Sequence, residues 1–319
     1  MPGAKTPPAR DLPDIAALVA RMRAGERRAL SRVVTELERF SAAAPSLLHA
    51  LEPHLGSALV VGFTGPPGAG KSTLVNAFTA RARRAGRSVG IIAVDPSSPI
   101  SGGAILGDRI RMTATLDDDG VFMRSLASRG HSGGLCPAAV RVIDALDAAG
   151  KDLILIETVG TGQSEIDVTE IADVRVLVTA PGLGDDIQAM KAGLIDVVDV
   201  VVVNKADSVG ADRTAHQLRH ALTLARASCE APVLKTTAAT GEGVDALETA
   251  IVEIAARRAA LGARERRRRR ARYLIARAAA ERLARRLKES GHSRLDALAD
   301  AVLSGTVSAE DAAARLLED

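Results

Sequence analysis

The sequence predicts an α/β fold in which a doubly wound, mostly parallel sheet carries helical extensions at both ends of the chain. Three observations indicate this. From Ala58 to about Ala255, short runs of β-branched apolar residues alternate with longer helical patterns, which is typical of a parallel sheet covered by helices on both faces. Before this region, Ile, Leu and Val recur at three- and four-residue spacing. After it, Ala, Arg, Leu and Glu dominate and no strand candidate occurs.

Residues 1–57 are expected to form a tail followed by a helical extension. The Pro-rich, polar stretch 2–13 favours disorder. The apolar periodicity that follows predicts short helices, with breaks at Gly25 and Pro45. These helices are expected over residues 15–23, 26–40 and 46–52.

Residues 58–255 are expected to form the sheet domain. Its strand candidates contain few polar residues, which predicts that they are buried on both faces. The strands are expected over residues 58–64, 88–94, 121–125, 153–158, 174–179, 198–204 and 233–236. The helices between them are expected to begin near Lys71, Pro137, Asp186, Ala211 and Val244.

Residues 256–319 are expected to form a helical arm. One long helix is predicted from beyond Ala255 to about Lys288, and two short helices over 295–303 and 308–317. A capping box of Ser308 with Asp311 is expected to begin the last of them. Helices with so little core of their own must pack on the sheet domain, on another subunit or on a client protein.

The composition narrows the classes of function. Hydrophobic residues make up 47% of the chain and charged residues 25%, as in ordinary globular proteins. No stretch approaches the roughly 20 apolar residues of a membrane span, and the N-terminus lacks the apolar core of a signal peptide, so we expect a cytoplasmic protein that does not bind a membrane. Cys136 and Cys229 have no CxxC or His-rich partner, which argues against a disulfide framework and a thiolate zinc site.

Nucleic acid is not an expected partner. The net charge is only +3 and aromatic residues make up 2% of the chain, which leaves few stacking platforms. Arginines recur over residues 264–272, but successive positions face all sides of a helix. We therefore expect a solvated stretch or the edge of an interface there.

A phosphate-binding loop is the sharpest local signal. Residues 65–72, GPPGAGKS, fit the pattern GxxxxGK[ST] between a predicted strand and a predicted helix, which indicates a P-loop NTPase. Backbone N–H groups of such a loop point at phosphate oxygens, and the helix N-terminus adds partial positive charge. Lys71 is expected to reach the β- and γ-phosphates, and the Ser72 hydroxyl to ligate Mg²⁺. The expected nucleotide contacts are Gly65, Pro66, Pro67, Gly68, Ala69, Gly70, Lys71, Ser72 and Thr73.

A second motif predicts the base. Asn204, Lys205 and Asp207 form an NKxD sequence at the end of a predicted strand. A carboxylate can accept from both N1–H and the exocyclic amine of guanine, whereas adenine offers a lone pair at N1, so the motif favours GTP over ATP. Thr237 and Ala238 follow the last strand, where GTPases place a backbone N–H against guanine O6.

Acidic residues follow other strands. Asp95 follows the second strand, and Glu157 begins an ETVG sequence where ordinary GTPases have DxxG. Either carboxylate can hold a magnesium-bound water, and Gly160 can offer its N–H to a γ-phosphate. The longer side chain of Glu157 favours contact through water over direct ligation. Asp108 is a third acidic candidate for the metal, and for all three the alternative is helix capping or surface charge.

Five ordered motifs resemble those of the MeaB/ArgK-type GTPases, which are G-protein chaperones of adenosylcobalamin-dependent acyl-CoA mutases in the SIMIBI class of P-loop proteins. The motifs are FTGPPGAGKST at 63–73, VDPSS at 94–98, GDRIRM at 107–112, ETVGTGQSE at 157–165 and PGLGDDIQAMK at 181–191. The resemblance runs from about Ala17 to Lys288, and the segment after Lys288 matches no motif.

The resemblance implies a G domain bound to GTP or GDP with Mg²⁺, and a homodimer formed through the C-terminal helices. It implies that Asp95, Asp108 and Glu157 surround the metal and its waters. It also implies that residues 182–192 form a switch whose Lys191 meets the nucleotide when the mutase is bound.

The expected chemistry is slow GTP hydrolysis by positioning and charge neutralisation. Lys71 is expected to draw electron density from the β,γ bridge, and a carboxylate such as Asp95 or a backbone group to orient water. Thr161 stands where small GTPases place a glutamine, and Gln163 is a candidate substitute. Turnover is expected to rise when a partner brings in Lys191.

Alternatives remain open. A P-loop kinase would need an acceptor pocket with a general base, and NKxD argues for GTP, which few kinases use. A nickel metallochaperone GTPase is disfavoured because the sequence has no Cys/His cluster. Methylmalonyl-, isobutyryl-, ethylmalonyl- and hydroxyisobutyryl-CoA mutases all fit as the client.

Overall fold

The computed structural model divides the chain into two compact units, Met1–Arg270 and Ala271–Asp319. It describes residues 14–95, 118–127, 137–158, 168–183, 197–224, 231–258, 262–289 and 293–317. The expected tail 2–13 and the helix expected near Asp186 lie outside this range.

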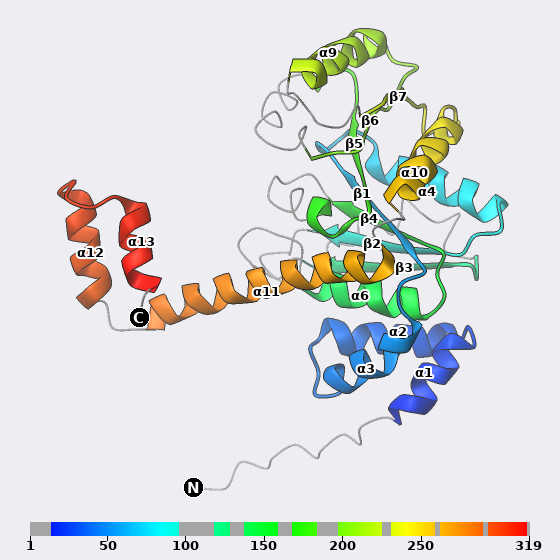
Figure 1. The fold of residues 1–319 in the computed structure, drawn as a ribbon. Coiled ribbons are helices and arrows are strands. Elements are labelled where there is room, and N and C mark those ends of the chain that lie inside the picture. The colour runs from blue at the N-terminus through cyan, green and yellow to red at the C-terminus, as the bar shows by residue number, and fades with distance from the viewer. Residues whose placement is uncertain are drawn as a thin grey trace, which may run out of the picture. The chain divides into compact units, whose positions relative to one another are not determined.

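The first unit is built on a seven-stranded sheet in the order β3-β2-β4-β1-β5-β6-β7, in which all paired strands run parallel. Figure 1 shows helices on both of its faces, so the predicted α/β architecture is confirmed. The strands are β1 (Leu59–Thr64), β2 (Val89–Asp95), β3 (Val121–Ala127), β4 (Leu153–Thr158), β5 (Val174–Thr179), β6 (Val200–Val203) and β7 (Val233–Lys235).

Among the described residues of the first unit, four helices pack on the sheet. They are α4 (Lys71–Arg84), α6 (Pro137–Ala148), α9 (Ala211–Leu224) and α10 (Val244–Arg258). Alternate strand residues face opposite sides. Val200 and Val202 belong to the core under α4 and α10, whereas Val201 and Val203 pack with α9, so these helices cover opposite faces of the sheet.

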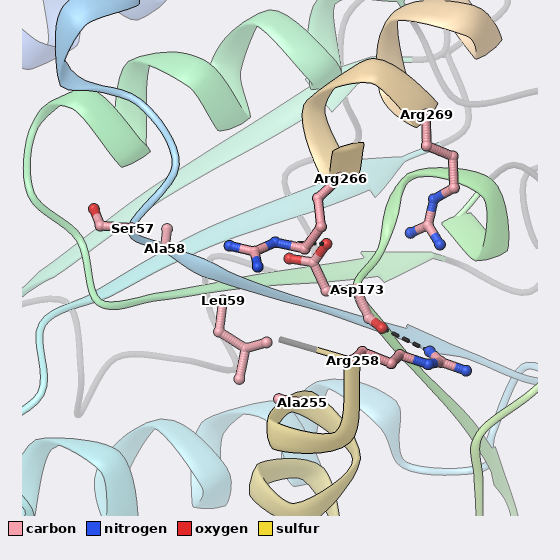
Figure 2. A pocket seen from close by; sticks show the side chains of 8 residues that line it. All are labelled: Ser57, Ala58, Leu59, Asp173, Ala255, Arg258, Arg266 and Arg269. Atoms are coloured by element: carbon pink, nitrogen blue, oxygen red, sulfur yellow. Dashed lines mark hydrogen bonds and ion pairs between the residues drawn. The ribbon is translucent and has the colours of Figure 1, made fainter. Parts of the chain in front are cut away.

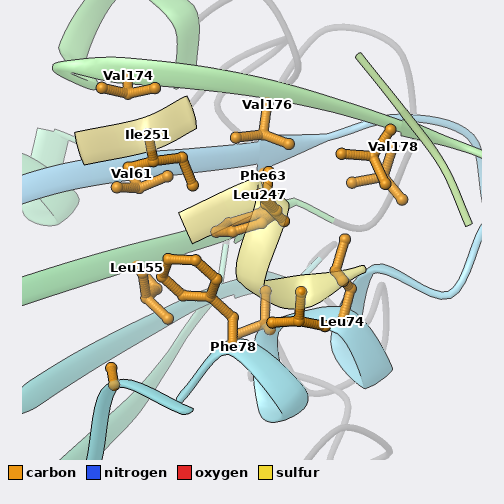
Figure 3. Packing of buried hydrophobic residues seen from close by; sticks show 14 of the residues in the cluster. Val61, Phe63, Leu74, Phe78, Leu155, Val174, Val176, Val178, Leu247 and Ile251 are labelled. Carbon is orange, nitrogen blue, oxygen red and sulfur yellow. The ribbon is translucent and has the colours of Figure 1, made fainter. Parts of the chain in front are cut away.

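The larger core lies between the central strands, α4 and α10 (Figure 3). Phe63 of β1 and Phe78 of α4 meet edge to face, with ring centroids 6.0 Å apart and planes inclined by 62°. Leu74 and Leu247, from the two helices, are fully buried in the same cluster. Burying side chains of this size stabilises the fold by about 1.5–3 kcal/mol each, which holds α4 and the loop before it against β1.

The N-terminal extension consists of α1 (Ile15–Arg23), α2 (Arg27–Glu38), α3 (Ala44–Leu51) and the 3₁₀ turn Glu52–His54. The Asp14 carboxylate caps α1 by accepting from Ala17 N–H at 3.1 Å. Helix α2 packs against α6. It ends earlier than the periodicity predicts because Phe40 adopts φ +53°, outside the right-handed helical region.

The long helix expected beyond Ala255 is present, but it begins later than predicted because the preceding helix continues past the expected boundary. Helix α10 ends at Arg258, and α11 (Gly262–Glu289) begins at a glycine with φ +68°. An α-helix cannot run through such a residue. In the second unit, α12 (Ser293–Leu303) packs against α13 (Ala309–Leu317).

The capping box at α13 is present, since Asp311 N–H donates to Ser308 Oγ at 3.0 Å. None of the helices in the described ranges is both long and apolar enough to cross a membrane.

Arginines of the 264–272 run make tertiary contacts, which corrects the expectation of a solvated stretch. Arg270 is 4% exposed, and it donates to Ile171 O at 2.9 Å and to Asp173 Oδ2 at 3.0 Å. Arg266 donates to Gly56 O at 3.1 Å. The start of α11 is therefore anchored to the amino-terminal edge of the sheet by side chains that sequence periodicity could not assign.

Candidate nucleotide-binding site

The phosphate-binding loop joins the carboxyl end of β1 to the N-terminus of α4, at the sheet edge where ligands of open α/β folds bind. Gly65 begins the loop with φ +139°. A Cβ at this position would lie 1.9 Å from the carbonyl oxygen of Val178, on the neighbouring strand β5. Only glycine therefore fits where the loop leaves the sheet.

Gly70 sets the other end of the loop. It caps α4 in the left-handed conformation, with φ +84°. A Cβ there would lie 2.4 Å from Asn204 Nδ2. The loop thus packs directly against the end of β6, and the backbone N–H groups at the start of α4 remain available to an anion.

Lys71, the first residue of α4, is 6% exposed. Its Nζ donates to the carbonyl oxygens of Gly65 at 2.7 Å and Pro66 at 2.8 Å. These acceptors hold the ammonium group over the loop, where a phosphate would be cradled. Pro67, Gly68 and Thr73 are solvent-exposed, whereas Ala69 is fully buried.

Ser72 and Glu157 meet beside this lysine. Ser72 Oγ donates to Glu157 Oε1 at 2.5 Å, and the Glu157 side chain is 5% exposed near the end of β4. Hydroxyl and carboxylate oxygens are the ligand types that Mg²⁺ prefers. This donor pair therefore fits the metal that the motif implies.

Asn204 links the phosphate loop to the expected base-binding loops. Its Nδ2 donates to Ala69 O at 2.9 Å and to Gly70 O at 3.4 Å. Its Oδ1 accepts from Thr236 Oγ1 and from Ala238 N–H, both at 3.1 Å. One buried amide thus holds three loops from distant parts of the sequence in a single arrangement.

The rest of the NKxD loop lies beside it. Lys205 has φ +55°, and its Cε lies 4.0 Å from where a Cβ of Gly70 would be. Asp207 is exposed. Ala206 N–H donates to Thr236 O at 3.0 Å, and Thr237 N–H donates to Glu242 O at 3.0 Å. The first of these bonds holds the two expected guanine-binding segments side by side, and the second closes the turn that follows Thr237.

Sequence reasoning missed three threonines at this edge. Thr64, Thr158 and Thr179 end β1, β4 and β5, which are adjacent strands. All three are at most 1% exposed, and their hydroxyls find no hydrogen-bond partner among the residues that the structure describes. The strand register places them on the face of the sheet opposite Phe63. A threonine as the final residue of several strands was the only signal that could have found them.

Several expected residues lie outside the structural description. These are Asp108, Gly160, Gln163, Lys191 and the side chain of Asp95, whose backbone ends β2. Within the described ranges, no cluster of three or more His, Cys, Asp or Glu side chains is placed to hold a metal ion. The structure brings together Lys71, Ser72, Glu157, Asn204 and Ala238.

Comparisons with known proteins agree with this site. Residues 27–292 match the family described as methylmalonyl-CoA mutase-associated GTPase MeaB. A Pyrococcus horikoshii protein assigned as a GTPase is 49% identical over 241 residues, which cover 74% of this chain and 76% of that protein. GTPase ArgK of Escherichia coli is 39% identical over 249 residues, or 75% of each chain. A crystal structure of a LAO/AO transport system kinase superposes with a TM-score of 0.78 at 28% identity, covering 97% of this chain and 98% of that one.

Proposed function

Because this chain belongs to the MeaB family of methylmalonyl-CoA mutase-associated GTPases, we propose that it is a GTP-dependent chaperone of an adenosylcobalamin-dependent acyl-CoA mutase. The chain is a GTP-hydrolysing enzyme, in agreement with relatives that are named GTPases. In the proposed role, its nucleotide state gates the loading of cofactor into the mutase and protects the loaded enzyme.

The observation that carries the nucleotide part of the proposal is the position of Asn204. Its amide donates to the phosphate loop through Ala69 O at 2.9 Å and accepts from Ala238 N–H at 3.1 Å. Phosphate and base subsites are therefore held in one rigid unit. The exposed carboxylate of Asp207 reads the N1–H and amino group of guanine, and the segment at Thr237 and Ala238 meets O6.

Lys71 and the loop amides bind the phosphates. The ammonium group, which donates to the Gly65 and Pro66 carbonyls, exchanges these acceptors for β- and γ-phosphate oxygens. The backbone N–H groups at the start of α4 add donors that need no rearrangement, because the loop glycines already hold the required backbone conformation, whereas Ala69 N–H already donates to Pro66 O at 3.4 Å. Catalysis in this class rests on such positioning and charge stabilisation.

Ser72 and Glu157 would hold a magnesium ion, with Ser72 as the direct ligand and Glu157 acting through bound water. The ion, when bound, would neutralise charge that develops on the phosphates. Asp95 and Asp108 are proposed as further carboxylates of this set, and Gly160 as a γ-phosphate donor. The family resemblance supports their assignment.

We propose that intrinsic turnover is low and that the mutase raises it. The groups assigned to this step are Gln163, which orients water, and Lys191, which meets the nucleotide when the partner is bound. We also propose that the C-terminal helices pair two copies of the chain. A mutase client gives such an arm a surface on which to pack.

The test of this function is a steady-state GTPase assay with and without a purified mutase. We expect turnover to rise with the cognate mutase and to stay low with Lys191→Ala at the same mutase concentration. The four candidate mutases are assayed separately, which identifies the client. If none of them changes the GTPase rate or co-purifies with the GTP-bound chain, the chaperone role is excluded while GTP hydrolysis stands.

A further inference from the structure

A second cavity lies at the opposite edge of the sheet from the phosphate loop. Its volume is about 180 Å³, and Figure 2 shows it between the start of β1, the residue before β5, the end of α10 and the start of α11. It is lined by Ser57, Ala58, Leu59, Asp173, Ala255, Arg258, Arg266 and Arg269. Neither the sequence motifs nor the proposed function uses these residues.

The cavity is surrounded by more cationic than anionic groups. Figure 2 shows Arg266 of α11 beside the Asp173 carboxylate, Arg258 of α10 at the Asp173 carbonyl oxygen, and Arg269 of α11 near them. The guanidinium groups at or next to the cavity belong to Arg175, Arg258, Arg266, Arg269 and Arg270, and the carboxylates to Asp147, Asp173 and Asp199. Five positive charges therefore meet three negative charges.

Asp199 and Asp147 are already saturated. Asp199 is 2% exposed, and it accepts from Arg175 Nε at 2.9 Å and from Arg258 Nη1 at 2.7 Å. Asp147 accepts from the backbone N–H groups of Gly56 at 2.6 Å and Ala58 at 2.9 Å. Neither carboxylate is available to a further cation.

Asp173 already pairs with two arginines of α11. Its Oδ2 accepts from Val60 N–H and from Arg270 Nη2, both at 3.0 Å, and its Oδ1 lies 3.6 Å from Arg266 Nε. Asp173 therefore already faces two guanidinium groups, Arg270 and Arg266, although its buried Oδ1 accepts no hydrogen bond from the described residues.

Arg269 is the cation left over. It donates to the carbonyl oxygen of Ala172, its Nε is buried without a hydrogen-bond partner, and within the described ranges it forms no ion pair. Burial lowers its pKa, and the nearby arginines 175, 270 and 258 lower it further against the opposing effect of Asp173. The residue is half-buried, but its Nε is shielded from solvent, and an unsatisfied charged donor in such a position is costly unless an ion or ligand accepts from it.

We propose that this cavity is a binding site for a small oxyanion, a carboxylate or a phosphate, held by Arg269 and Arg266 of α11. Guanidinium groups bind both anions through paired N–H donors. The volume of about 180 Å³ lies below the roughly 300–1,000 Å³ of pockets for drug-sized ligands, so the ligand is small. Leu59 and Ala255 line the cavity beside the arginines and give a short alkyl group an apolar surface.

The ligand joins elements that are distant in sequence. Arg266 and Arg269 belong to α11, whereas Leu59 begins β1 and Arg258 ends α10. An anion between them offsets the repulsion among these arginines, and so it stabilises the attachment of the first turns of α11 to the sheet.

The test is titration calorimetry on the full-length chain saturated with GDP and Mg²⁺, so that the phosphate loop is occupied. Inorganic phosphate and propionate are titrated in separate arms at constant ionic strength. We expect saturable heat from at least one probe, and the tighter of the two distinguishes a phosphate from a carboxylate ligand. In Arg269→Gln the dissociation constant should rise at least about tenfold, which corresponds to the loss of about 1.4 kcal/mol.

Arg268→Gln is the matched control. Arg268 precedes Arg269 on α11, but its side chain is 67% exposed, and it lies 3.9 Å from the carboxylate of Glu265. It should bind the probe as the parent chain does. If Arg269→Gln does not fold, as judged by circular dichroism, Arg266→Gln takes its place. The proposal is overturned if neither anion gives saturable heat. It is also overturned if Arg269→Gln and Arg268→Gln weaken binding equally.

Discussion

Replacing Asn204 by alanine should weaken both the fold and nucleotide binding, because one amide joins three loops. The substitution removes bonds to Ala69 O at 2.9 Å, Thr236 Oγ1 at 3.1 Å and Ala238 N–H at 3.1 Å, together with a longer one to Gly70 O at 3.4 Å. At about 1 kcal/mol for each of the three shorter bonds, the free energy of unfolding should fall by about 3 kcal/mol.

Guanine-nucleotide affinity should fall at the same time, since the phosphate loop and the segment at Ala238 lose their common anchor. Urea denaturation followed by circular dichroism measures the first effect, and titration with a fluorescent GDP analogue measures the second. Thr236→Val is the matched control, because it removes only the 3.1 Å bond to Asn204 Oδ1 and should cost about 1 kcal/mol. A variant Asn204→Ala within about 0.5 kcal/mol of the parent chain, with unchanged GDP affinity, would refute the reasoning.

Three further predictions follow from the same contacts. Asp207 is exposed, so Asp207→Asn should leave the free energy of unfolding within about 0.5 kcal/mol of that of the parent chain. The variant should bind GDP more weakly and favour xanthosine diphosphate, because the 2-oxo group of xanthine accepts from an amide N–H. Competition binding between the two nucleotides tests this. Phe63→Ala should cost about 3–5 kcal/mol in urea denaturation because it removes a fully buried ring that packs on Phe78, whereas Val209→Ala at a fully exposed position should cost almost nothing. Burial raises the pKa of Asp144 to about 6, above the unfolded value of about 3.9, so the folded state binds a proton more tightly than the unfolded state. The free energy of unfolding should therefore fall as the pH rises from about 4 to 6. Asp144→Asn should remove this slope, and an unchanged slope in pH-dependent denaturation would contradict the prediction.

The strands and the phosphate loop were predictable because their signals are local. The central strands β1, β4, β5 and β6 are short β-branched runs that are buried on both faces, whereas β7 at the sheet edge is not buried. The loop pattern stands between a strand and a helix and needs no residue from elsewhere in the chain. The structure confirms these elements at Leu59–Thr64 and Lys71–Arg84. The NKxD motif could be identified in the same way, because its four residues are adjacent in the sequence.

Partnerships between distant residues were not predictable in this way. The contact of Asn204 with Ala69 spans 135 positions, and that of Ser72 with Glu157 spans 85. The boundary between α10 and α11 was expected at Ala255, whereas α10 ends at Arg258 and α11 begins at Gly262, because composition does not reveal which glycine adopts a positive φ.

The amino-acid sequence by itself therefore determined the sheet, the phosphate loop and the family, since hydrophobic periodicity and short motifs depend only on near neighbours. Only the tertiary structure determined which arginines of α11 are buried and which carboxylates they contact. The spacing of these arginines suggested a solvated stretch or the edge of an interface, yet Arg270 is buried against Asp173, and Arg269 lies beside a cavity and forms no ion pair with the part of the chain that the structure describes. Whether a charge is neutralised depends on which carboxylates the folded chain brings near it, and no local pattern records that distance.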